Sequence, residues 1–121
     1  MLQTINPKPP NYDLEERTFQ FAHRVNSYVA KLPKSISNLE NGKQLVRAAG
    51  SIGANYIEDN ESLSKKDFVM RAKISKKESK ECRFWLRLTE PSESEKREQS
   101  ALIQESTELM RIFGAILEKF K

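Results

Sequence analysis

The chain has few of the residues from which catalytic and metal sites are built. Its 121 residues include one cysteine, one histidine and four glycines. The single cysteine, Cys82, cannot form an intramolecular disulfide, so we expect a reducing, cytoplasmic compartment. One cysteine and one histidine are too few for a structural zinc site, and no glycine-rich phosphate-binding loop is present. We therefore expect no metal, no cofactor and no enzymatic activity.

Long apolar runs are also absent. No stretch approaches the roughly 20 apolar residues of a membrane-spanning helix, and residues 1–13 lack the apolar core of a signal peptide. Instead, 31% of the residues are charged and 37% are hydrophobic, which is typical of amphipathic helices. The net charge of +4 is compatible with a nucleic-acid partner without requiring one. We expect no association with a membrane.

Apolar residues recur at helical spacing in the first half of the chain. A proline-rich, flexible arm is predicted over residues 1–12. Asp13 and Glu16 then form a capping-box pattern that opens a first helix, and Pro33 ends it. A second helix is predicted over about residues 42–60, with the preceding segment as a connection.

The second half of the chain predicts two more helices. Ser64 and Asp67 form another capping-box pattern, and a fourth helix begins near Ser92 or Ser94 and runs to the C-terminus. No segment alternates like a strand. Four helices with short connections predict an all-α fold, an antiparallel up-down-up-down four-helix bundle that forms a single domain over residues 13–121.

Two glycines in the interior of the second predicted helix need an explanation. Each of Gly50 and Gly53 costs about 0.5–1 kcal/mol relative to alanine. We interpret them as sites where a neighbouring helix packs closely, rather than as a ligand site. Cys82 falls among the core-facing residues of the third helix and is interpreted as a buried thiol. His23 projects away from the apolar face of the first helix and is interpreted as solvated.

Positive charge is concentrated on the third predicted helix. Residues 65–87 contain nine basic and three acidic residues, a larger excess than the whole chain carries. Six of the nine project to one side of the helix, and we call them the basic row: Lys66, Lys73, Lys76, Lys80, Arg83 and Arg87. On the first helix, Arg17, Arg24 and Lys31 recur every seven residues. Both sets could follow a phosphate backbone, or they could be solvated faces balanced by the acidic fourth helix.

The opposite flank of the third helix is apolar and lies outside its main core-facing positions. It either widens the core or packs against another subunit, and we favour oligomerisation. The predicted interface residues are Met70, Ile74, Trp85 and Leu88.

The segment "RAAGSIGANYIEDNESLSKKDF" resembles the signature of a bacterial four-helix-bundle family. Its members are encoded by intervening sequences inserted in 23S ribosomal RNA genes. The matching positions are Arg47, Ala48, Ser51, Ile52, Asn55, Glu58, Ser64, Asp67 and Phe68. "SKKESKECRFWLRL" is similar to the third helix of that family. Asp59 stands where the family usually has glycine.

The resemblance implies a homopentamer with possible RNA association and no catalytic activity. The family is similar in fold to the accessory variability protein of diversity-generating retroelements, which binds a reverse transcriptase and nucleic acid. Within the motif, we expect Asn55 and Glu58 to pair with Arg47, or with lysine and arginine residues on a neighbour, and to fix helix and subunit geometry. A ligand role is the alternative. Two functions stay open: a nucleic-acid-associated oligomer, or a scaffold that docks a protein partner such as a reverse transcriptase without binding nucleic acid.

Overall fold

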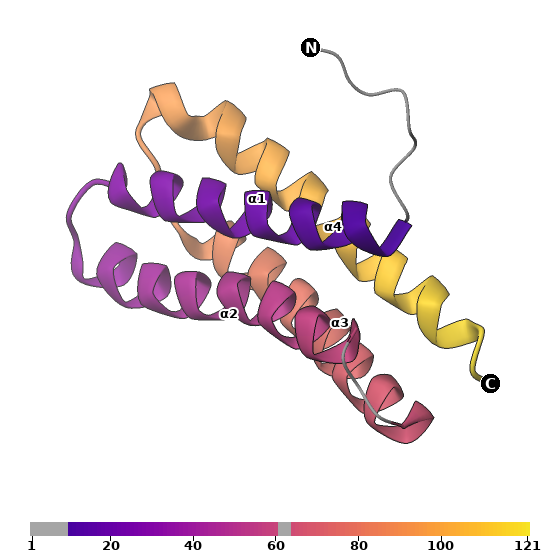
Figure 1. The fold of residues 1–121 in the computed structure, drawn as a ribbon. Coiled ribbons are helices and arrows are strands. Elements are labelled where there is room, and N and C mark those ends of the chain that lie inside the picture. Colours follow the sequence, from indigo (N-terminus) through magenta and orange to yellow (C-terminus); the bar gives the residue numbers. More distant parts are fainter. Residues whose placement is uncertain (1–9, 61–63) are drawn as a thin grey trace, which may run out of the picture.

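The computed structural model describes residues 10–60 and 64–121, with side chains described for 14–57 and 64–121. Within these ranges the chain forms helices and no strand. The helices are α1 (Pro10–Ala30), α2 (Ile36–Asn60), α3 (Lys65–Leu88) and α4 (Lys96–Glu118), with a short 3₁₀ turn, η1 (Glu93–Glu95), ahead of α4. They alternate in direction, so that consecutive helices run antiparallel (Figure 1). The predicted all-α up-down-up-down bundle is confirmed.

One hydrophobic core runs between the four helices. Consecutive helices pack against each other most extensively, and α1 also contacts α4, which closes the bundle. Each helix contributes residues at alternating spacings of three and four, as expected for shallow helix packing. The largest buried apolar side chains are Phe21, Val25, Tyr28, Leu45, Ile52, Leu86, Leu102, Leu109 and Phe113.

The first two helices begin earlier than the sequence predicted. Helix α1 starts at Pro10, three residues before Asp13, so residues 10–12 belong to the helix rather than to the predicted arm. Proline is tolerated in the first turn, because the amide it lacks has no helical partner there. Residues 1–9 and the Asp13 side chain lie outside the described residues. Helix α2 starts at Ile36 rather than near residue 42, and its cap is Ser35, whose Oγ accepts from the Asn38 amide at 3.0 Å.

Glycines in α2 allow α1 to approach closely. A Cβ at Gly42 would lie 3.0 Å from Val29 Cγ1, and a Cβ at Gly53 would lie 3.0 Å from Thr18 Oγ1. Both distances are shorter than ordinary contacts, so the packing interpretation holds for Gly53 and extends to Gly42. It is wrong for Gly50, where a Cβ would meet nothing within 4 Å.

Small polar residues let α3 pack closely on α2. The buried Ser75 hydroxyl donates to the Ile52 carbonyl of α2 at 3.0 Å, and Ser79 donates to the Ser75 carbonyl within α3 at 2.8 Å. Both hydroxyls are therefore satisfied inside the core. The predicted cap is confirmed at the start of α3, where Ser64 Oγ accepts from the Asp67 amide at 3.0 Å.

Hydrogen bonds join the α1–α2 connection to the α3–α4 connection at one end of the bundle. The buried Asn38 amide group donates to the carbonyls of Pro33 and Glu90 at 2.8 and 3.0 Å, and its Oδ1 accepts from the Glu90 amide at 2.9 Å. Beside it, the Tyr28 and Thr89 hydroxyls bond at 2.7 Å. The Asn38 side chain thus satisfies backbone groups of both connections.

Candidate nucleic-acid interface

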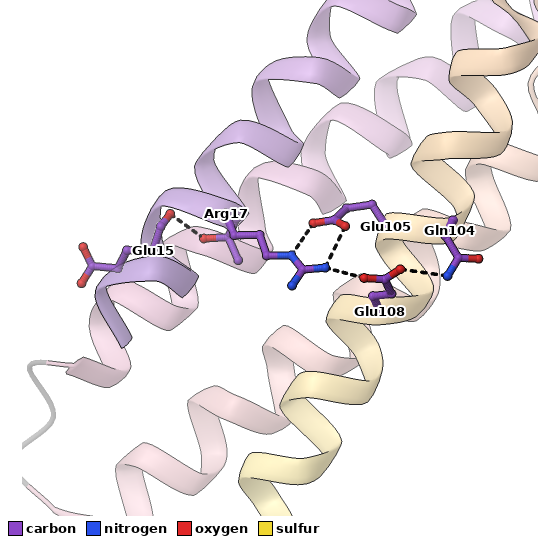
Figure 2. Close-up of polar contacts among 6 residues, drawn as sticks. Glu15, Arg17, Gln104, Glu105 and Glu108 are labelled. Atoms are coloured by element: carbon purple, nitrogen blue, oxygen red, sulfur yellow. Dashed lines mark hydrogen bonds and ion pairs between the residues drawn. The ribbon is translucent and has the colours of Figure 1, made fainter. Parts of the chain in front are cut away.

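The basic residues of α1 lie against acidic residues of α4. Arg17 makes a two-pronged contact with Glu105, with Nε–Oε2 at 2.7 Å and Nη2–Oε1 at 2.9 Å, and Nη2 also reaches Glu108 Oε1 at 2.6 Å (Figure 2). Gln104 donates to the second oxygen of Glu108 at 2.9 Å. The hydrogen bond to Glu105 is the main reason that the pKa of Arg17 is raised above its ordinary value.

The other two residues of this set follow the same pattern. Arg24 contacts both oxygens of Glu98 at 3.0 Å, and Lys31 lies 3.8 Å from Glu95. The hydrogen bond to Glu98 raises the pKa of Arg24. Both arginines of α1, and Lys31 directly after the helix, therefore have carboxylate partners within the chain. For the two arginines this fits the interpretation that the acidic fourth helix balances their charge, whereas Glu95, the partner of Lys31, lies in η1.

The six predicted basic residues of α3 are placed differently. They are the basic row defined from the sequence. None of them forms an ion pair with a carboxylate among the described residues. Five are exposed and Arg83 is half-buried. Lys76 extends over α4, where a Cβ at Gly114 would lie 3.7 Å from its Nζ. The basic row is thus a positive surface that the fold leaves unneutralised.

The predicted interface residues of α3 divide into two kinds. Met70 and Leu88 are 49% and 44% exposed, whereas Ile74 and Trp85 are half-buried and Trp85 packs against the core. The adjoining Phe84, which the sequence analysis did not single out, is 55% exposed. Its place opposite the core-facing positions of α3 was a signal that could have found it. The role of the four predicted residues in subunit contacts stays a prediction.

Most residues of the family motif lie on α2, and two of them bond to side chains of α3. Arg47 reaches Glu78 Oε2 at 3.5 Å and Glu81 Oε1 at 3.4 Å, both on α3. Asn55 donates to the Ser51 carbonyl and hydroxyl at 2.9 and 3.0 Å, and its Oδ1 accepts from Arg71 at 3.2 Å. The described partners of Asn55 are therefore Ser51 and Arg71. Of the two predicted pairings, the structure thus has the one with an arginine on a neighbour, here helix α3, rather than the one with Arg47. These contacts join the two helices.

The remaining motif residues lie near the start of α3. The Asp67 amide is bonded by the Ser64 cap, and the Phe68 ring packs on Phe120 of α4 with centroids 5.1 Å apart. The Glu58 side chain, for which a pairing was predicted, lies outside the described residues. The motif therefore includes contacts to both neighbours of α3.

The cysteine and the histidine, which are the usual catalytic residue types, lie in surroundings that do not activate them. Cys82 is fully buried, and burial raises the pKa of its thiol, which disfavours the reactive thiolate. His23 is exposed and stacks on Phe19, with ring centroids 6.2 Å apart. Among the described residues, no three His, Cys, Asp or Glu side chains are grouped so as to hold a metal ion. In the same part of the chain, every helix is too short or too polar to span a membrane.

An apolar cleft opens where α1 turns into α2. Ile36 and Leu39 on its wall are 85% and 60% exposed, and its basic residues are Lys34, Lys43 and Arg47. Among the described residues, no acidic side chain lines it. No residue of the basic row is among the described residues that line the cleft, so we treat the two as separate surface features.

Comparisons with known proteins agree with the architecture. A family model described as "23S rRNA-intervening sequence protein" matches residues 11–115. A crystal structure of a protein of unknown function from the S23 ribosomal protein family of Bacteroides thetaiotaomicron superposes with a TM-score of 0.76 and 25% sequence identity. The superposition covers 89% of this chain and 97% of that one. A search of curated proteins finds no match. Neither description names an enzymatic activity.

Proposed function

The chain belongs to the family of 23S rRNA-intervening sequence proteins, and from this membership and its surface charges we propose that it is a non-enzymatic protein that associates with RNA. The binding surface is the basic row of α3. The observation that carries the proposal is the absence of described carboxylate partners for these six side chains, while Arg17, Arg24 and Lys31 are all paired. Unpaired lysine and arginine side chains can replace the counterions of phosphates, which supplies affinity without base readout.

The proposal narrows the predicted nucleic-acid surface from nine residues to six. Arg17, Arg24 and Lys31 would have to give up their contacts with α4 and η1 before they could bind phosphates. The basic row extends from residue 66 to residue 87, which at 1.5 Å per residue is about 32 Å. If all six contact phosphates, log Kd should change with log salt concentration with a slope of magnitude about 4 for a single strand and about 5 for a duplex.

The homopentamer implied by the family resemblance is part of this proposal. The exposed Met70 and Leu88 supply apolar surface that a neighbouring copy could cover. A pentamer would also place five basic rows in one particle, which raises the effective affinity for a long RNA. Size-exclusion chromatography with light scattering on nuclease-treated protein tests the assembly, and a monomer would remove this part of the proposal.

The test of RNA association is a double charge reversal, Lys76→Glu with Lys80→Glu. We expect at least a tenfold loss of affinity for a structured RNA at about 0.1 M salt and a shallower salt dependence, because two phosphate contacts become repulsive. The matched control is Lys96→Glu with Lys121→Glu, which changes the net charge equally at two locally paired sites on α4 and at the C-terminus. Equal losses in both variants, or none in the first, would overturn the proposal. Circular dichroism and thermal melting check the fold.

A protein-docking scaffold is the second candidate function. The observation that favours it is the apolar cleft at the α1–α2 turn, where the exposed Ile36 and Leu39 offer apolar surface to a partner. This function predicts a stoichiometric protein complex that survives nuclease treatment and is lost in Leu39→Glu. Recovery of nuclease-sensitive material alone would exclude it.

A further inference from the structure

We propose that the RNA taken up by the basic row is single-stranded, and that Phe84 provides a surface on which an unpaired base stacks. This inference rests on the proposed function and names the class of RNA that the same surface binds. It is drawn from one exposed aromatic ring that lies among unpaired cations. Phe84 is 55% exposed, although neighbouring residues of α3 bury an extensive core face.

The exposure of Phe84 is unusual among the phenylalanines of the bundle. Phe21 and Phe113 are 1% and 0% exposed, and Phe68 and Phe120 cover each other. Only Phe19 on α1 is comparably exposed among the described phenylalanines, at 60%. Phe19 lies outside the basic row and stacks on His23, so it provides a natural control.

Helix geometry places Phe84 beside the basic row. Lys80 and Arg87 are four residues before and three residues after it, which makes them its neighbours on the helix surface. At 100° per residue, its direction from the helix axis differs by about 20° from that of Lys73 and about 40° from that of Lys80. A strand held by these cations would therefore pass the exposed ring.

The acidic neighbour of Phe84 is already engaged elsewhere. Glu81, three residues before it, lies 3.4 Å from Arg47 of α2 and 4.0 Å from Lys77. These contacts offset its charge on the side of the helix away from the basic row. The electrostatic surroundings of Phe84 therefore favour an anionic chain.

The ring is also held in place from within the bundle. It packs edge-to-face on Trp85, with centroids 5.0 Å apart and planes at 80°, and Trp85 in turn packs against the core. A ring that is already ordered loses little entropy when a base stacks on it. Trp85 is the single tryptophan of the chain, so its fluorescence reports on this contact.

The chemistry of stacking selects the single strand. In a duplex the base faces are covered by neighbouring pairs, so that only phosphates, sugars and base edges are accessible. Unpaired bases can be splayed onto an aromatic side chain, and such a contact is largely independent of sequence. A protein that bound duplex phosphates alone would have no use for the exposed ring.

The experiment compares Phe84→Leu with Phe19→Leu, using a 12-nucleotide oligouridylate, a 12-nucleotide oligoadenylate and a 12-base-pair RNA duplex. We expect Phe84→Leu to lower affinity for both single strands about fivefold or more, and to leave duplex affinity unchanged. Phe19→Leu should change neither, and Phe84→Tyr should retain binding because it keeps the aromatic face. The oligonucleotides should also change Trp85 fluorescence in the wild type.

Each other outcome identifies what has failed. If RNA binds but Phe84→Leu changes single-strand and duplex affinity equally, or not at all, the inference is overturned and the proposed function stands. If none of the RNAs binds the wild type, both are overturned. If light scattering shows that Phe84→Leu changes the size of the assembly, Phe84 belongs to a subunit contact and the inference is also overturned.

Discussion

The basic residues of α1 and those of α3 share a spacing but differ in what lies opposite them. Arg17 and Arg24 are seven residues apart, as are Lys73 and Lys80. The pair on α1 faces glutamates of α4, which have matching spacing, whereas Lys76 of the basic row crosses Gly114 of the same helix. A row of positive charge on a helix therefore indicates a binding surface only where the adjacent helix supplies no carboxylates.

The largest expected effect comes from removing the carboxylate partners of the α1 arginines, which leaves them as unpaired as the basic row of α3. Replacing Glu98, Glu105 and Glu108 together with glutamine should raise RNA affinity about tenfold, because Arg17 and Arg24 become free to bind phosphates. The control replaces three glutamates that pair only within their own segments, Glu40, Glu93 and Glu118, and alters the net charge equally. Fluorescence anisotropy with one RNA measures both. Equal gains would show that overall charge, rather than the freed arginines, sets the affinity.

A smaller effect is expected on stability, where a substitution on α1 should cost more than one on α3. Arg17→Ala removes a two-pronged, partly buried contact and leaves Glu105 without its partner, so we expect a loss of about 1–2 kcal/mol in the free energy of unfolding. Lys73→Ala should change it by less than about 0.5 kcal/mol, because Lys73 is exposed and has no described ion pair. Urea denaturation measures both variants. The difference should shrink at high salt, and similar values for the two would contradict the comparison.

The smallest expected effect is a difference in acid sensitivity. Hydrogen bonds from Gln104 and then from Arg17 lower the pKa of Glu108 in the folded chain. A carboxyl group with a lowered pKa contributes stability that is present above its unfolded pKa of about 4.3 and is lost as pH falls through the folded value. Arg17→Ala removes one of these hydrogen bonds, so below about pH 4 its melting temperature should fall less steeply than that of the wild type. Parallel curves would show that Arg17 does not control this titration.

The sequence predicted the number of helices and the core-facing positions, because both follow from the spacing of apolar residues. Cys82 on α3 is buried where this spacing placed it, and Leu86, four residues later, is buried beside it. The Ser64 cap was also predictable, since it depends only on residues three positions apart. These features depend on local order along the chain.

The features that were missed depend on contacts between distant residues. The predicted start of α2 near residue 42 was wrong, since the helix begins at Ile36 and continues through Gly42, where the close approach of Val29 offsets the cost of a glycine in a helix interior. The matched spacing of arginines on α1 and glutamates on α4 is visible in the sequence. Whether they meet depends on which helices are neighbours.

Asn38 has a consequence for how the bundle opens. Its side chain bonds three backbone groups, one near the end of α1 and two at Glu90, beyond the end of α3. Local unfolding of one connection would expose unpaired groups of the other, so the two should open in a single cooperative step. Native-state hydrogen exchange would then show amides of two segments, some 50 positions apart in the chain, exchanging with one shared free energy: that end of the protein behaves as one folding unit assembled from two turns.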